Sequence, residues 1–252
     1  MAKFAIITGA SAGIGAELAK LAAADGYELL LAADTPFTDT VANAETLDVD
    51  LSTFEGVDRL LEAAGGRQID LLCANAGHGL GRAFLEQDPA AWKHVVDTNI
   101  VGTAYLLQKV LPTMVSRNDG KVLVTGSIAG YIPGAFQAVY NGSKAFVDSF
   151  VAALQNEIKD ADGVTLTNLM PGPTDTDFFE RGDMMDTDVG TDPNKEDPAD
   201  TAKNGWEALM SGKASVVSGL KNKIQSAVAN VTPNAILAEQ HRKMAEPGTA
   251  DD

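Results

Sequence analysis

The chain has 252 residues and a formal net charge of −16 at pH 7. So acidic a protein is not expected to bind nucleic acid or an anionic membrane surface, because both require a basic footprint. The N-terminus lacks the apolar core and cleavage site of a signal peptide, and no apolar run approaches the roughly 18 residues of a membrane span. We therefore expect a cytoplasmic α/β protein without nucleic-acid or membrane partners.

Cysteine and histidine usage argues against disulfides and metal sites. Cys73 is the only cysteine, so no disulfide can form within the chain, and its apolar neighbours predict a core residue. His78, His94 and His241 lie at unrelated spacings. No Cys-x-x-Cys pattern or histidine cluster indicates a metal, and we predict none.

Short apolar runs alternate with longer amphipathic ones, which predicts a parallel sheet flanked by helices. The expected strands are 4–8, 28–33, 45–49, 69–75, 121–125, 164–170 and 214–218. The expected helices are 13–25, 53–64, 90–116, 139–159, 199–210 and 224–244, the last around Pro233. We predict one domain over residues 1–252, a doubly wound parallel sheet of the Rossmann type, with a lid around 177–210 and a frayed tail over 246–252.

A glycine-rich turn, Thr8–Gly15 (TGASAGIG), joins the first strand to the first helix. Glycines let the backbone turn tightly and approach a pyrophosphate, and the helix N-terminus offers free N–H groups with a partial positive charge. The position of the turn, after a first strand and before a helix, supports dinucleotide binding. A glycine-rich turn without a ligand is the alternative.

A phenol and an ammonium group share one face of the expected helix 139–159. Tyr140 and Lys144 are four residues apart, so their side chains are neighbours. A nearby cation favours the phenolate, so we expect the pKa of Tyr140 to fall below its usual value of about 10. Ser127 follows the strand 121–125, at the edge where open α/β sheets bind ligands.

In order along the chain, these segments resemble the short-chain dehydrogenase/reductase family. That family has Thr-Gly-x-x-x-Gly-x-Gly, Asn-Ala-Gly, an Asn, a Ser, Tyr-x-x-x-Lys and Pro-Gly. The matching segments here are Thr8–Gly15, Asn75-Ala76-Gly77, Asn99, Ser127, Tyr140–Lys144 and Pro171-Gly172. The resemblance covers about residues 3–176. The family usually has a second asparagine before Asn75, where this chain has Ala74.

The resemblance implies a hydride transfer between a nicotinamide cofactor and a ketone or secondary alcohol of moderate size. Tyr140 is the expected general acid/base, Lys144 its cationic neighbour, Ser127 the residue that holds the substrate oxygen, and Asn99 the support of a proton path to Lys144. The implied cofactor-binding residues are Gly9, Ser11, Gly13, Ile14, Gly15, Asp34, Asp48, Val49, Asn75, Ala76, Gly77, Tyr140, Lys144, Pro171, Gly172, Thr174 and Thr176.

The expected cofactor is NAD(H), with NADP(H) as the alternative. A 2′-phosphate requires cations, whereas a free 2′-hydroxyl is well served by a carboxylate. No lysine or arginine lies between Lys20 and Arg59, and Asp34 follows the second strand. Thr35 and Thr38 remain candidate contacts for a phosphate.

The expected helices 90–116 and 139–159 carry apolar residues on more than one face, and relatives pair such helices across subunits. We therefore expect a homodimer or homotetramer. Three other functions stay open: a catalytically silent dinucleotide-binding module, a non-redox enzyme on the same scaffold, and an interaction protein. The presence of Asn99, Ser127, Tyr140 and Lys144 argues against the first, and the intact Thr8–Gly15 segment argues against the second. A titration with NADH would identify the third.

Overall fold

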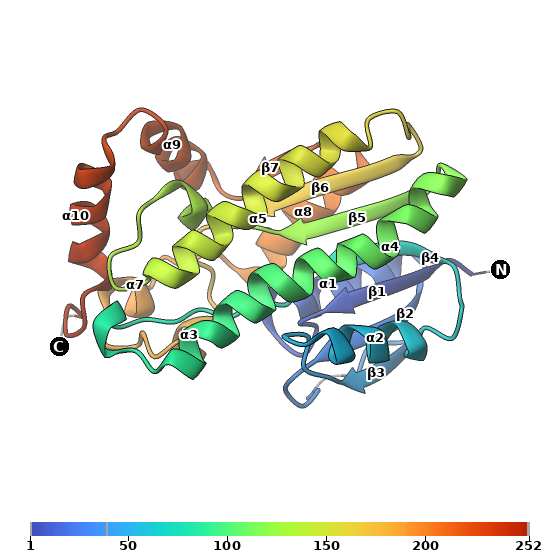
Figure 1. Ribbon diagram of the computed structural model, residues 1–252, viewed down its shortest axis with the longest axis horizontal. Coiled ribbons are helices and arrows are strands. Elements are labelled where there is room, and N and C mark those ends of the chain that lie inside the picture. Colours follow the sequence, from blue (N-terminus) through green and yellow to red (C-terminus); the bar gives the residue numbers. More distant parts are fainter. Residues whose placement is uncertain (1, 39, 251–252) are drawn as a thin grey trace.

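A single parallel sheet of seven strands forms the centre of the computed structural model, which describes residues 2–38 and 40–250 (Figure 1). The strand order is β3-β2-β1-β4-β5-β6-β7. The strands are β1 (Phe4–Thr8), β2 (Glu28–Ala33), β3 (Ala44–Asp48), β4 (Ile69–Ala74), β5 (Gly120–Thr125), β6 (Val164–Met170) and β7 (Ser215–Val217). This topology confirms the predicted doubly wound, Rossmann-type fold.

Helices cover both faces of the sheet, so the central strands are apolar on both sides. The helices are α1 (Gly13–Ala24), α2 (Phe54–Ala63), α3 (Pro89–Val96), α4 (Thr103–Arg117), α5 (Ala138–Glu157), α6 (Phe178–Arg181), α7 (Asp188–Thr191), α8 (Pro198–Met210), α9 (Leu220–Ala229) and α10 (Asn234–Ala245). Side chains of α2, α4 and α5 pack in one apolar core, and those of α1 and α8 pack in the other. Cys73 is fully buried in the second core, as predicted. Among the described residues, no helix has the length and apolar character needed to cross a membrane.

The predicted helix 90–116 is interrupted by a π-helical turn, Asp97–Gly102, which lies between α3 and α4. Gly102, at the end of this turn, packs against the backbone just before α2. A Cβ on Gly102 would be 2.0 Å from the carbonyl oxygen of Leu51. Hydrophobic periodicity does not reveal one extra residue in a helical turn, so the sequence predicted a continuous helix.

The C-terminal third agrees with the sequence-based expectations only in part. Residues 198–210 form α8, which confirms the predicted helix 199–210. Its Trp206 and Leu209 are buried in the same core as α1, so this part of the predicted lid packs on the sheet. The predicted helix 224–244 is divided at Pro233 into α9 and α10. Residues 246–250 of the expected frayed tail are attached, because the N–H groups of Gly248 and Ala250 donate to the carbonyl oxygen of Asp186. Residues 251 and 252 lie outside the described part of the chain.

Asn75, at the end of β4, ties three neighbouring strands together at the edge where the site lies. Its Nδ2 donates to the carbonyl oxygens of Thr8 and Gly9 at 3.2 and 3.3 Å. Its Oδ1 accepts from the hydroxyl of Thr125, on β5, at 2.9 Å. The Thr8 hydroxyl in turn accepts from the backbone of Asn75 and Ala76, both at 3.0 Å. One amide side chain therefore fixes the relative positions of β1, β4 and β5.

The substitution Thr125→Val tests this connection with little change of shape. It removes the hydroxyl that donates to Asn75 and leaves a partly buried amide oxygen without this donor, so unfolding should require about 1–3 kcal/mol less free energy. Urea unfolding measures the difference. The matched control is Thr165→Val in β6, where the side chain is only half-buried. Equal losses in the two variants would contradict the proposed importance of the Asn75 contacts.

Candidate active site

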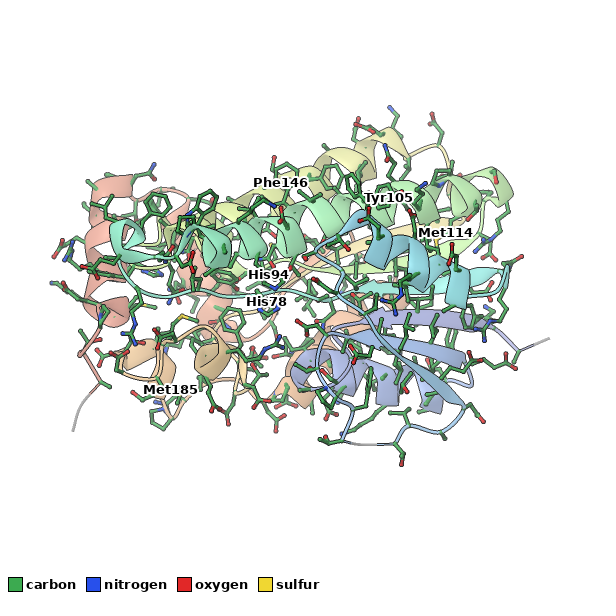
Figure 2. The ribbon with its side chains drawn as sticks, turned by 60° about the horizontal axis from the view of Figure 1, so that its bottom comes forward. His78, His94, Tyr105, Met114, Phe146 and Met185 are labelled. Atoms are coloured by element: carbon green, nitrogen blue, oxygen red, sulfur yellow. The ribbon has the colours of Figure 1, made fainter. Side chains whose placement is uncertain are left out.

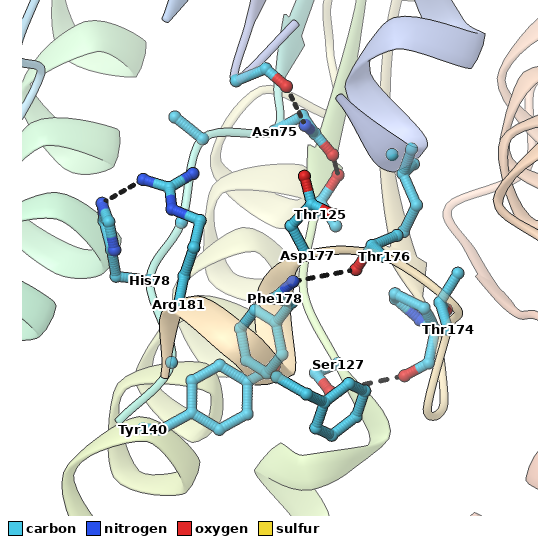
Figure 3. Close-up of a pocket in the computed structure, with 18 of the residues that line it drawn as sticks. Asn75, His78, Thr125, Ser127, Tyr140, Thr174, Thr176, Asp177, Phe178 and Arg181 are labelled. Atoms are coloured by element: carbon cyan, nitrogen blue, oxygen red, sulfur yellow. Dashed lines mark hydrogen bonds between the residues drawn. The ribbon is translucent and has the colours of Figure 1, made fainter. Parts of the chain in front are cut away.

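A cavity of about 370 Å³ lies at the carboxyl ends of the central strands (Figure 3). Open parallel sheets bind their ligands in this position. Most residues that the sequence assigned to a site line it: Gly9, Ser11, Gly13, Ile14, Asp34, Val49, Asn75, Ala76, Gly77, Ser127, Tyr140, Lys144, Pro171, Gly172, Thr174 and Thr176. Three others, Gly15, Asp48 and Asn99, do not reach its surface.

The glycine turn between β1 and α1 forms one wall of the cavity. Gly9 and Gly13 have φ of +62° and +55°, a conformation that favours glycine. A Cβ on Gly15 would lie 2.1 Å from the carbonyl oxygen of Gly9, so only glycine permits this close approach of helix and strand. Ala12 provides no side-chain cap to α1, which leaves the first N–H groups of the helix free for an anion. The turn therefore fits the diphosphate of a dinucleotide.

Tyr140, Lys144 and Ser127 meet at the inner end of the cavity, and all three are buried. The Ser127 hydroxyl caps the short 3₁₀ turn Ile128–Tyr131 by accepting from the N–H of Ala129, and it donates to the carbonyl oxygen of Pro171 at 3.3 Å. The ammonium group of Lys144, one helical turn after Tyr140, donates to the carbonyl oxygen of Thr125 at 2.8 Å. A proton donor, a hydroxyl and an ammonium group thus share one pocket.

Burial determines the protonation of this group. It raises the pKa of Tyr140 to about 12, although the nearby Ser127 hydroxyl acts in the opposite direction. Burial also lowers the pKa of Lys144 to about 8. The expectation that the pKa of Tyr140 would fall below its usual value is therefore wrong, because desolvation of the phenol is the largest influence on it.

Asn99 lies behind the cavity, in the π-helical turn. Its Oδ1 accepts from the backbone N–H of His78 at 2.8 Å, and its Nδ2 donates to the carbonyl oxygen of His78 and to the Ser143 hydroxyl, both at 2.9 Å. A Cβ on Gly77 would be 3.2 Å from this Oδ1 and 3.6 Å from Nζ of Lys144. The Asn99 side chain therefore lies close to Lys144 while it holds the segment after β4.

Asp34, at the end of β2, contacts two side chains that the sequence did not assign to the site. His78 Nε2 lies 3.0 Å from its carboxylate, and Arg181, on α6, donates to both carboxylate oxygens at 3.1 Å. Figure 3 shows Arg181 beside His78, with the guanidinium group inside the cavity. The hydrogen bond with His78, followed by the charge of Arg181, holds the pKa of Asp34 well below its usual range.

Arg181 could not have been found from spacing, because 147 positions separate it from Asp34 and it lies in an acidic, aperiodic segment. His78 offered a weak signal, since it directly follows Asn75-Ala76-Gly77. Its ring also lies 4.5 Å from that of His94 (Figure 2). Asp34, His78 and His94 bring their ligand atoms within 4.8 Å of one another, but the charge of Arg181 opposes a metal cation there.

The segment 177–197 contributes Phe178, Phe179, Arg181 and Val189 to the lining of the cavity. The ring of Phe178 lies 5.0 Å from that of Tyr140, and a Cβ on Gly79 would be 2.3 Å from the Phe178 ring. Arg82, in the segment after β4, holds the segment 177–197 in place through ion pairs with Asp183 and Asp186, both at 2.7 Å. The segment therefore encloses the phenol of Tyr140 in an apolar environment.

Comparisons with known proteins agree with this architecture. A family profile described as short chain dehydrogenase matches residues 3–186. An uncharacterized oxidoreductase of Staphylococcus saprophyticus is 35% identical over 220 residues, which cover 82% of this chain and 91% of that protein. A very-long-chain 3-oxoacyl-CoA reductase of Neurospora crassa is 35% identical over 172 residues, 62% of this chain and 52% of the relative.

Solved structures show the same fold. A short-chain dehydrogenase from Sphingobium yanoikuyae in complex with NADPH has a TM-score of 0.79 and 22% identity, covering 92% of this chain and 97% of its own. A short-chain dehydrogenase/reductase from Burkholderia phymatum in complex with NAD has a TM-score of 0.77 and 22% identity, covering 90% and 92%. The profile match contains the glycine turn, Ser127, Tyr140 and Lys144. The chain therefore belongs to the short-chain dehydrogenase/reductase family of oxidoreductases.

Proposed function

We propose that this protein reduces a ketone of moderate size to a secondary alcohol, and catalyses the reverse reaction, with a nicotinamide dinucleotide as hydride carrier. The observation that carries the proposal is the buried group of Ser127, Tyr140 and Lys144 beside a glycine turn suited to a diphosphate. A bound nicotinamide supplies or accepts the hydride. The chain's own residues bind the dinucleotide, hold the substrate oxygen and transfer the proton.

Tyr140 is the proposed proton donor to the carbonyl oxygen. Because burial raises its pKa to about 12, the phenol carries its proton at neutral pH and is ready for reduction. Ser127 donates a hydrogen bond to the same oxygen and stabilises its developing charge. The Lys144 ammonium, held by the carbonyl of Thr125, supports the phenolate that remains. Oxidation of an alcohol requires that phenolate and should therefore become faster as the pH rises.

The substrate pocket is proposed to lie between the 3₁₀ turn, the segment 177–197 and the last helix. Its apolar lining includes Ile132, Phe178, Phe179, Val189 and Met244. Such a surface favours the apolar part of a ketone over a charged substrate. The segment 177–197 is the proposed lid, because substrate and Phe178 compete for the space in front of Tyr140.

NAD(H) is the proposed cofactor, since Asp34 is ionised and lies where a ribose 2′-hydroxyl would bind. Arg181 supports the alternative, NADP(H), because its guanidinium group lies beside Asp34 and could pair with a 2′-phosphate. NAD(H) would therefore be favoured by the carboxylate of Asp34, and NADP(H) by the guanidinium group of Arg181.

A panel of ketones, followed at 340 nm with NADH and with NADPH, tests both the activity and the cofactor. We expect turnover with NADH and a kcat/KM at least about tenfold higher than with NADPH, equal to about 1.4 kcal/mol. Arg181→Met should leave the preference for NADH in place. A tenfold preference for NADPH that Arg181→Met abolishes would establish the alternative. Binding of NADH without any turnover would favour a silent dinucleotide-binding module.

A homodimer or homotetramer built on α4 and α5 is also proposed. Phe146 lies on the outer surface of α5 with 41% of its area exposed, and its ring stacks on Phe150 at 5.5 Å (Figure 2). Exposed aromatic side chains on a long helix are typical of contact surfaces between subunits. Light scattering at micromolar concentration should give at least twice the monomer mass, and Phe146→Glu should lower it. A strict monomer would reject the assembly.

The cytoplasmic location stays a prediction from sequence.

A further inference from the structure

Asp148 is a partly buried residue, with one fully buried carboxylate oxygen, that the proposed reaction does not use. It lies on α5 four residues after Lys144, which is four residues after Tyr140, so the three side chains follow one face of the helix. Asp148 stands on the far side of Lys144 from the cavity and does not line it. Its effect on the reaction must therefore pass through neighbouring groups.

One hydrogen bond and one close backbone contact connect Asp148 to elements that carry the site. Nδ2 of Asn168, on β6, donates to Oδ1 of Asp148 at 2.8 Å. The same carboxyl group packs directly against the backbone at Gly126, the residue before Ser127. It therefore restricts the backbone of the residue whose hydroxyl is proposed to hold the substrate oxygen.

The chain around Ser127 leaves space for this carboxyl group and for little else. A Cβ on Gly126 would be 1.9 Å from Oδ1 of Asp148, and a Cβ on Gly130 would be 2.4 Å from Oδ2. Glycines on both sides of Ser127 are thus required for the carboxyl group to fit. The presence of glycine at positions 126 and 130 therefore reflects the space that the Asp148 carboxyl group occupies, as well as the turn itself.

The arrangement is costly as a purely structural device. Oδ2 of Asp148 and Oδ1 of Asn168 are both buried and have no hydrogen-bond partner among the described residues. A neutral or apolar side chain would avoid this desolvation. The negative charge is therefore expected to have a role of its own, and the nearest cation on the same helix face is Lys144.

We propose that Asp148 is a positioning residue of the reaction, which holds the backbone of Ser127 in place and supports the ammonium charge of Lys144. The proposal rests on the function proposed above for Ser127, Tyr140 and Lys144. Four groups face the carboxyl: Lys144 and Tyr140 from α5, Tyr131 from the 3₁₀ turn, and Asn168 from β6. Lys144 is the only cation among them, so the Asp148 charge stabilises the charged form of Lys144 alone.

The sign of that response follows from the charges. Burial lowers the pKa of Lys144, and the charge of Asp148 acts in the opposite direction. Burial raises the pKa of Asp148 itself to about 6, so the carboxylate is ionised above that pH. Between neutral pH and about 8, the range in which Lys144 would otherwise lose its proton, the carboxylate therefore keeps more of it in the ammonium form.

The isosteric substitution Asp148→Asn removes the charge and tests the proposal without requiring turnover. Titration of the protein labelled with ¹³C at lysine Cε, with the Lys144 signal assigned by its loss in Lys144→Arg, gives the pKa of Lys144 directly. We expect this pKa to fall by about one unit, as for loss of one nearby opposite charge. The basic limb of the pH profile of kcat/KM for ketone reduction should move down equally. Asp148→Ser, which is smaller and also neutral, should give the same shift.

Glu157→Gln is the matched control, because it removes the same charge from the exposed end of the same helix. It should leave the Lys144 pKa and the pH profile unchanged. An unchanged Lys144 pKa in folded Asp148→Asn or Asp148→Ser would overturn the inference, even if kcat falls. A shifted Lys144 pKa in a protein that reduces no ketone would support the charge coupling and reject only the proposed function.

Discussion

The desolvated ammonium group of Lys144 is the constraint on which the site depends. It lies beneath the carboxyl ends of β4 and β5, and its hydrogen-bond partner is the neutral carbonyl oxygen of Thr125. A buried lysine without a carboxylate in direct contact is costly. The protein accepts this cost where a phenol, a serine hydroxyl and a dinucleotide-sized cavity meet. That coincidence is typical of functional sites, where perturbed pKa values cluster.

The edge of the sheet gives this group its fixed geometry. Asn75 connects β1, β4 and β5. The carbonyl oxygen of Thr125 accepts a hydrogen bond from the Lys144 ammonium, and the Thr125 hydroxyl donates to Asn75. The glycine turn is attached to the same asparagine through the carbonyl oxygen of Gly9. The glycine turn that would bind the diphosphate and the residues that would transfer the proton are thus connected through the Asn75 side chain. A change in the position of one should therefore alter the position of the other.

Local patterns allowed much of this arrangement to be predicted. Tyr140 and Lys144 lie on one helix, and the glycine turn follows one strand, so spacing alone indicated both. What the sequence could not reveal depends on long-range contacts. Arg181 reaches Asp34 across 147 positions, and the carboxyl group of Asp148 meets Ser127 and Asn168 only after β5, β6 and α5 have packed. The direction of the pKa shift of Tyr140 was predicted wrongly for the same reason, because burial is a property of the folded chain.

The central claim is that the phenol of Tyr140 donates the proton during hydride transfer, and its most direct test is Tyr140→Phe. The substitution removes one oxygen atom and keeps the ring that packs against Phe178. The account predicts that kcat for NADH-dependent ketone reduction falls at least about 100-fold, the lower range for a lost general acid, while the Kd of NADH from fluorescence changes by less than about twofold. A variant that binds NADH and turns over as fast as the wild type would contradict it.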